Sequence, residues 1–199
     1  MMNYRAQFNI AECCFEKITN PAFVGIFSDD APMSLDSPAI GVAYRIRRSI
    51  TITSYAGGGA GFPADDGVVR ELTKQHSELL ETYIKTIPQD KLYFFEDGSM
   101  YSLAMMRLLV QIAKKFSKHV TCIAIEPGAY NGRRRMHQFE SSWEIINELS
   151  DEAHLLEFAP PNSKCTIAEY YALKMNTVLS QLAGIESGLD TYDYYPKQG

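Results

Sequence analysis

The chain has 199 residues, of which 46% are hydrophobic, a size at which one compact core is normal and a second full domain would be cramped. Its 19 Lys and Arg against 24 Asp and Glu give a formal net charge of -5, which argues against nucleic acid as a partner. No run approaches the roughly 20 apolar residues that span a bilayer, and the first residues lack the pattern of a signal peptide. We therefore expect a cytoplasmic protein without a membrane span.

Strand-like runs alternate with segments of helical periodicity along most of the chain. Helices are expected at residues 9–19, 65–87, 101–116, 133–149 and 167–183. Strands are expected at residues 22–27, 49–54, 91–95, 120–125 and 154–158. The alternation predicts an α/β fold, a three-layer sandwich in which helices cover both faces of a mainly parallel sheet. Ligand sites are then expected at the carboxyl ends of the strands.

A glycine-rich segment, residues 57–61, lies between an expected strand and a helix that begins near Asp65. Backbone amides and a helix N-terminus at such a turn can hold phosphate, and glycine permits the close approach. Glycines also occur in such turns for purely steric reasons. Both readings stay open for this segment.

A second segment, residues 126–136, follows an apolar strand and brings three arginines to the start of a helix. These arginines could meet a ribose or a phosphate. The alternative is a solvated basic helix start, which is disfavoured because cations oppose the positive end of the helix dipole.

Five stretches resemble FtsZ proteins. Residues 120–136, VTCIAIEPGAYNGRRRM, resemble the strand, loop and helix start that FtsZ proteins write as TVAVVTKPFxFEGRRRM. The others are FVGIFSD at 23–29 (FIAINTD in the family), GGGAGFPADDG at 57–67 (GLGAGADPEIG), LLEFAPPN at 155–162 (LIVIPN) and ALKMNTVL at 172–179 (AxxANDVL). The resemblance implies a tubulin/FtsZ nucleotide-binding domain over residues 1–187, followed by a tail at 188–199.

The resemblance also implies a guanine-nucleotide pocket. Asn9 and Asn176 fall where FtsZ proteins contact guanine, and Arg135 falls at the family's sugar or phosphate arginine. Asn131 replaces the glutamate that contacts the ribose, so sugar recognition would depend on a neutral amide. The phosphate-contacting positions are Gly58, Gly59, Ala60, Gly61 and Gly98.

The family's signature loop, GGGTGTG, aligns with residues 98–104, GSMYSLA, which keep a single glycine. Met100, Tyr101 and Leu103 stand where backbone should touch phosphate, and such side chains would exclude phosphate oxygens. Glu96 and Asp97 add negative charge beside it. We interpret this acidic pair as belonging to an exposed loop rather than as a general acid and base.

The two ends of the chain depart from the family as well. Residues 4–9 contain no glycine where the family has its first glycine-rich loop. Near the other end, Asp193 matches the first of the aspartates that activate water on a neighbouring subunit's GTP, whereas Pro196 occupies the place of the second. The chain ends before the family's activation domain would begin.

The remaining reactive side chains predict no further site. The cysteines form no CxxC pair and no zinc-ligand spacing, so we expect reduced thiols, with Cys13 and Cys14 adjacent on a helix. The histidines are scattered, which favours structural or solvated roles, and Met105 and Met106 fit helix packing. No protein metal site is expected. The residues concerned are Cys13, Cys14, Cys122, Cys165, His76, His119, His137 and His154.

The first hypothesis is a degenerate FtsZ/tubulin-like domain, a pseudo-GTPase that acts by association with itself or with a complete FtsZ/tubulin homologue in filament assembly, as in cell division. It would bind GTP or GDP weakly or not at all. The alternative is a divergent GTPase whose site is completed between subunits by residues 57–61, Arg135, Asn176 and Asp193. Mg²⁺ would then accompany the nucleotide, with Asp29, Glu96 and Asp97 as its candidates. A third reading is the same fold with an unrelated ligand.

Overall fold

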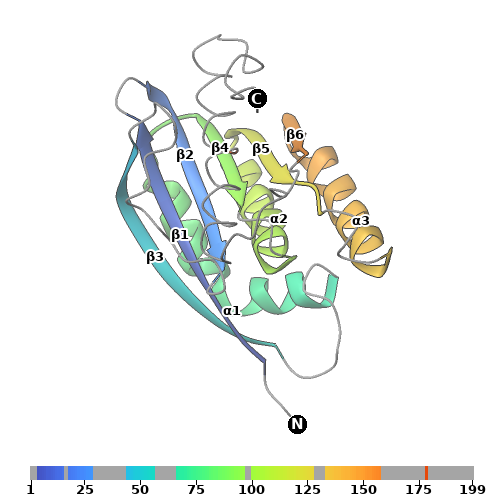
Figure 1. Ribbon diagram of the computed structural model, residues 1–199. Helices are drawn as coiled ribbons and strands as arrows, with labels where there is room; N and C mark the ends of the chain where they lie inside the picture. Colours follow the sequence, from blue (N-terminus) through green and yellow to red (C-terminus); the bar gives the residue numbers. More distant parts are fainter. Residues whose placement is uncertain are drawn as a thin grey trace, which may run out of the picture.

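The computed structural model describes residues 4–15, 18–28, 44–56, 66–96, 100–127, 133–157 and 178 (Figure 1). Six strands and three helices make up the described elements. In chain order they are β1 (Tyr4–Phe15), β2 (Ile18–Ser28), β3 (Tyr44–Ala56), α1 (Asp66–Lys85), β4 (Lys91–Glu96), α2 (Met100–Lys115), β5 (His119–Ile125), α3 (Arg133–Leu149) and β6 (Glu152–Leu156).

All six strands belong to one sheet, in the order β3-β1-β2-β4-β5-β6, which Figure 1 shows from one side to the other. The pairs β2–β4, β4–β5 and β5–β6 are parallel, whereas β1 is antiparallel to both β2 and β3. Because β1 alone is reversed, β3 runs in the same direction as β2. The α/β class is thus confirmed, but the sheet is mixed, with two antiparallel pairings at its amino-terminal side.

The helix expected at residues 9–19 is wrong, because residues 4–15 form β1. Both edges of this strand are paired, Ile10 lying opposite Ile26 of β2 on one side and Ile50 of β3 on the other. Phe8 and Ile10 lie in the helix-covered core and Ala11 and Cys13 lie in the cluster on the other face, so only the short run from Gln7 to Ile10 alternates polar and apolar residues. Cys13 and Cys14 accordingly lie on a strand rather than on a helix.

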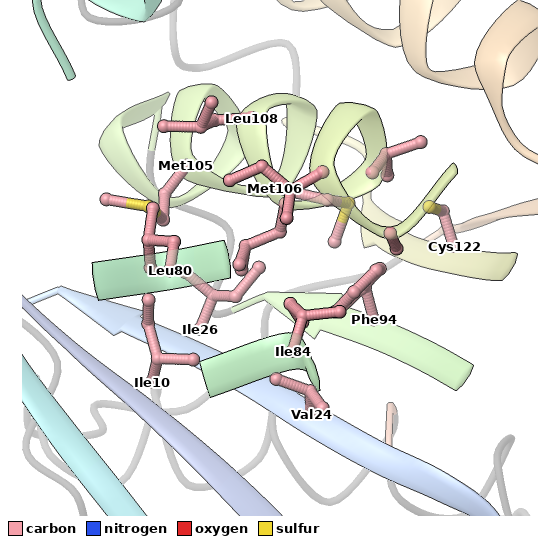
Figure 2. Packing of buried hydrophobic residues seen from close by; sticks show 14 of the residues in the cluster. Ile10, Val24, Ile26, Leu80, Ile84, Phe94, Met105, Met106, Leu108 and Cys122 are labelled. Carbon is pink, nitrogen blue, oxygen red and sulfur yellow. The ribbon is translucent and has the colours of Figure 1, made fainter. Parts of the chain in front are cut away.

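One face of the sheet is covered by all three described helices, whose apolar side chains share a single core with the strands. Helix α2 lies at the centre of this layer, packed between α1, α3 and the sheet. Met105 and Met106 are fully buried in it, which confirms their expected packing role. Figure 2 shows side chains of α1 lying between the strands and α2. The strand residues are Ile10, Val24, Ile26 and Phe94, those of α1 are Leu80 and Ile84, and those of α2 are Met105 and Met106.

A second apolar cluster lies on the opposite face of the central strands. Phe23 stacks on Tyr93 with ring centroids 5.4 Å apart, and Phe27 meets Phe95 edge-on at 6.0 Å. A Cβ at Gly25 would come within 2.5 Å of the Phe27 ring, so only glycine permits this pair of rings. Val178, which is helical and buried, packs into the same cluster.

Val178 is the one described residue of the helix expected at 167–183; the rest of that helix and the tail at 188–199 lie outside the described residues. None of the described helices has the length and the apolar character needed to cross a bilayer. The other expected strands and helices are confirmed, with ends that differ from the expected ones by a few residues at most points.

Candidate functional site

The carboxyl ends of the parallel strands meet at one edge of the sheet, where α/β proteins place their ligands. The registers Ile26↔Glu96 and Ile125↔Leu156 align the ends of β2, β4, β5 and β6. Strand β3 ends at the same edge because it runs in the same direction. The expected gathering of the strand ends before Gly57, Glu96 and Glu126 is therefore confirmed.

Asn9 lies close to this edge, although the element that carries it is a strand. It stands opposite Phe27 of β2 and Thr51 of β3, one residue from the pair Phe8↔Ser28. Its side chain is half-buried, and Oδ1 accepts a hydrogen bond of 2.8 Å from Thr51 Oγ1. Asn9 is therefore already held by a neighbouring strand on the sheet face that the described helices do not cover.

Glu96 overturns the interpretation of an exposed acidic loop. It is the last residue of β4 and only 1% exposed, and its Oε1 accepts a 3.1 Å hydrogen bond from the backbone N–H of Ile125. The carboxylate thus extends the ladder between β4 and β5 by one bond beyond Phe95↔Ile123. Asp97, its expected companion, lies outside the described residues.

Helix α2 occupies most of the stretch that aligns with the family's signature loop. It begins at Met100, and only three residues separate it from the end of β4. Ser102, Leu103 and Ala104 are fully buried, and Leu103 and Ala104 belong to the helix-covered core. These residues therefore fill the interior rather than presenting backbone amides in an open loop.

The arginine-rich segment does open a helix, as expected. Helix α3 starts at Arg133, which is exposed, and the backbone of Arg135 lies in the first turn. No acidic residue stands in that turn to balance the cations. Glu126 and Glu157, by contrast, directly follow β5 and β6, so acidic residues end three neighbouring parallel strands.

The structure places two of the ten expected site residues in different elements, Asn9 in the middle of β1 and Arg135 in the first turn of α3. The other eight lie outside the described residues: Gly58, Gly59, Ala60, Gly61, Gly98, Asn131, Asn176 and Asp193. Asp29, a candidate for Mg²⁺, lies outside them too. No group of three or more His, Cys, Asp or Glu that could hold a metal ion occurs within the described ranges.

A polar cluster that sequence reasoning missed lies away from this edge, under the last turn of α1. Glu12 of β1 is 3% exposed, and its two oxygens meet Arg47 Nη1 at 3.3 Å and Arg48 Nε at 2.6 Å. The register shifts here, with Glu12 opposite Arg48 and Cys13 opposite Ile46, so a bulge places two arginines against one carboxylate. No local signal could show this, because the partners are 35 and 36 residues apart.

The cluster also ties β3 to α1. Arg48 donates to the hydroxyl of Thr86 and, at 3.4 Å, to the carbonyl of Tyr83, and its guanidinium lies 4.6 Å from the centre of the Tyr83 ring. A cation at the carboxyl end of a helix is favourable for the helix dipole. Burial raises the pKa of Tyr83, which keeps its phenol neutral. These contacts describe a structural anchor rather than a reactive site.

The described cysteines are free thiols, as expected, and two of them are buried. Burial raises the pKa of Cys13 to about 12 and raises that of Cys122 as well, so both stay protonated at neutral pH. Cysteine chemistry is thus not indicated in the described part of the chain.

No protein-family model matches this chain, and no curated protein matches it either. Function is therefore inferred from the sequence resemblance and from the geometry of the described residues. In the described part, acidic residues stand at the ends of three neighbouring strands of the carboxyl edge, and buried side chains fill the start of α2. The arginines of this edge lie to one side, at the start of α3. Such an edge suits protein contact better than polyphosphate.

Proposed function

We propose that this chain is a degenerate FtsZ/tubulin-like domain that acts through association with copies of itself or with a filament-forming homologue, and that it binds guanine nucleotide weakly or not at all. The resemblance in sequence supports the family. The common edge formed by the ends of β3, β2, β4, β5 and β6 supports a nucleotide-domain type of scaffold.

The start of α2 is the observation that carries the loss of nucleotide binding. A phosphate site needs several backbone amides at the end of a strand, with space for oxygens around them. Here Leu103 and Ala104 are fully buried at the aligned positions, and three residues separate β4 from α2. A phosphate group would have to displace core side chains, which costs several kcal/mol.

Negative charge near the start of α2 also disfavours nucleotide binding. The Glu96 carboxylate is buried at the end of β4 beside the start of α2, and a polyphosphate there would meet negative charge at reduced dielectric. Glu96 also cannot turn away without breaking its bond to the Ile125 N–H. Sterics and electrostatics thus both favour a domain that has kept the scaffold without its nucleotide site.

The test is calorimetric titration of the purified chain with GTP and GDP, with and without Mg²⁺, together with phosphate release measured over a range of protein concentration. We expect no site tighter than about 100 μM, a value set by the weak end of specific ligand affinities. Phosphate release should equal the rate without protein. Electron microscopy should show no long filaments of this chain alone.

The arginines of α3 supply a matched pair of variants. Arg135→Ala removes the side chain that the resemblance assigns to the nucleotide, and Arg133→Ala removes an exposed arginine of the same turn. If micromolar binding appears and Arg135→Ala abolishes it while Arg133→Ala does not, the nucleotide site is intact and the proposal is wrong. Release that rises steeply with concentration and is lost in Asp193→Ala would favour the interfacial GTPase instead.

A further inference from the structure

The two edges of the sheet differ in length and in chemistry. Strand β6 has five residues, whereas β3 has 13. Short edge strands offer little backbone for pairing, and long ones are normally protected by charges, prolines or bulges. On the outer side of β3, no described strand pairs with it.

Protection on β3 is confined to its first part. Arg45, Arg47, Arg48 and the bulge opposite Glu12 all lie within residues 45–48. Residues 49–56, SITITSYA, have no charge, no proline and no glycine, and most of them are β-branched or aromatic. Within this run the sequence therefore has none of the charges or prolines that keep an edge from pairing with another chain.

The run is also held in a fixed strand conformation. Ile52 is 2% exposed and belongs to the helix-covered core, and Ile50 packs against the same core. Ser49 and Thr51 are exposed on the other face, where Thr51 donates to Asn9. An added strand would find backbone groups already in position, so the entropy lost on binding would be small.

We propose that residues 49–56 of β3 pair antiparallel with the same residues of a second copy of this chain, joining two sheets into one across a two-fold axis. The inference deepens the self-association in the proposed function and rests on it. It needs no nucleotide and no residue of the carboxyl edge.

The positions of the charged residues favour a second copy of this chain as the partner and an antiparallel direction of pairing. A two-fold axis perpendicular to the sheet sets each residue opposite one on the same face, so Ile52 can face its own counterpart and Thr51 can face Thr53. Arg48 then lies opposite residue 56, and the other arginines lie beyond the end of the partner strand. A parallel arrangement would bring the two arginine segments together, which is unfavourable. The antiparallel pair matches the uncharged residues with each other and keeps the two arginine segments apart.

The contact should be modest, because one strand pair buries less than the roughly 1,200 Å² of total surface typical of stable complexes. We expect a dimer with a Kd on the order of 10 μM. A two-fold interface closes on itself, so it yields dimers rather than filaments.

Sedimentation velocity over a range of concentration tests this with four variants of the full chain. Thr51→Lys puts two lysines on diagonal positions beside the axis and should weaken the dimer at least tenfold. Ser49→Lys places its two charges farther apart and should weaken it less. Thr51→Val loses the same bond to Asn9 without adding charge, and Ser141→Lys adds a charge on the exposed side of α3. Both of these should leave the dimer unchanged.

Hydrogen exchange gives a second measurement that needs no substitution. Amides of residues 49–56 should gain protection as concentration rises, and those of β6 should not. A chain that stays monomeric, a dimer that survives Thr51→Lys, or equal losses in Thr51→Lys and Ser141→Lys would overturn the inference. So would protection that appears only when a filament-forming homologue is added, because the edge would then serve another protein. None of these results restores nucleotide binding, so the loss of the GTP site is judged separately by titration.

Discussion

The sheet has a parallel half, formed by β2, β4, β5 and β6, and an antiparallel half, formed by β1 and β3. In β4, four consecutive residues, 92–95, are fully buried, with side chains in both apolar clusters. In β3, by contrast, exposed Ser49 and Thr51 alternate with Ile50 and Ile52, which pack on the helix side. A strand covered on both faces needs a continuous apolar run, whereas a strand open on one face needs alternation.

This difference shows where the molecule can meet partners. In the parallel half, most strand side chains are buried in the protein's own core. Its carboxyl edge carries acidic residues, and buried side chains fill the start of α2 there. In the antiparallel half, β3 exposes Ser49 and Thr51 on one face and has an outer edge that no described strand pairs with, whereas Ala11 and Cys13 of β1 are buried.

Equal truncations in the two halves should have unequal costs. Ile123→Ala in β5 removes a side chain that is 0% exposed and should lower the free energy of unfolding by about 2–5 kcal/mol. Ile50→Ala in β3 removes a half-buried side chain, so we expect about 1–2 kcal/mol. Urea denaturation of both variants measures the difference. Equal losses would contradict the division into a deeply and a shallowly buried half.

The anchor between β3 and α1 should depend on one arginine more than on the other. Arg48→Met leaves Glu12 buried with one weaker partner and should cost about 1.5–3 kcal/mol. Arg47→Met removes a side chain that is 56% exposed, so its loss should stay below about 1 kcal/mol. Denaturant unfolding of both variants compares them.

A double-mutant cycle supplies the control for this anchor. In a Glu12→Gln background, Arg48→Met should cost clearly less than in the natural chain, because the charge that it leaves unpaired is gone. An unchanged cost would mean that Arg48 acts through its packing on Tyr83 rather than through the ion pair.

The smallest expected effect on stability comes from Asp151, which lies in the turn before β6 and bonds to β5. Burial alone would raise its pKa, but hydrogen bonds from Lys114 and from the Val120 N–H, with the charges of Lys114 and His119, outweigh burial and lower it below 3.8. The folded state therefore binds this proton less readily than the unfolded state. The resulting stability is present above pH 3.8 and disappears as the pH falls through the folded pKa.

Asp151→Asn should thus be less stable than the natural chain at neutral pH, with the difference shrinking in acid. Thermal unfolding between pH 2 and pH 7 measures this difference in stability, and the difference should shrink mainly below about pH 4. Asp90→Asn is the matched control, because that side chain is 99% exposed and 3.7 Å from its lysine. A difference in stability that grows in acid would contradict the lowered pKa of Asp151 in the folded state.

The sequence predicted the parallel half well because several local signals agreed there. Residues 91–95 and 120–125 are short apolar runs, each flanked by helical periodicity, and that combination leaves few alternatives. It failed for β1, where residues on both faces are apolar and the pairing partners of Ile10 lie in two different strands. Long-range pairing overrode the local pattern in that segment.

The candidate site was harder to predict than the fold. Spacing placed Arg135 correctly at a helix start, and helical periodicity predicted a helix from residue 101, one residue from the observed start at Met100. Glu96 was interpreted as part of an exposed loop because such loops commonly carry acidic residues. Its acceptor bond from Ile125 depends on the alignment of two strands, which no local property of the sequence encodes.

The reversed direction of β1 also has a consequence for the order of folding. Its pairing with β2 begins at Phe15↔Ile18, across a short connection, whereas its pairing with β3 extends to Tyr4↔Ala56. Closing the short loop costs less entropy, so the β1–β2 hairpin should form early and β3 should dock late. Until then β1 would itself be a bare edge, and a nascent chain would be most prone to mispairing in that interval.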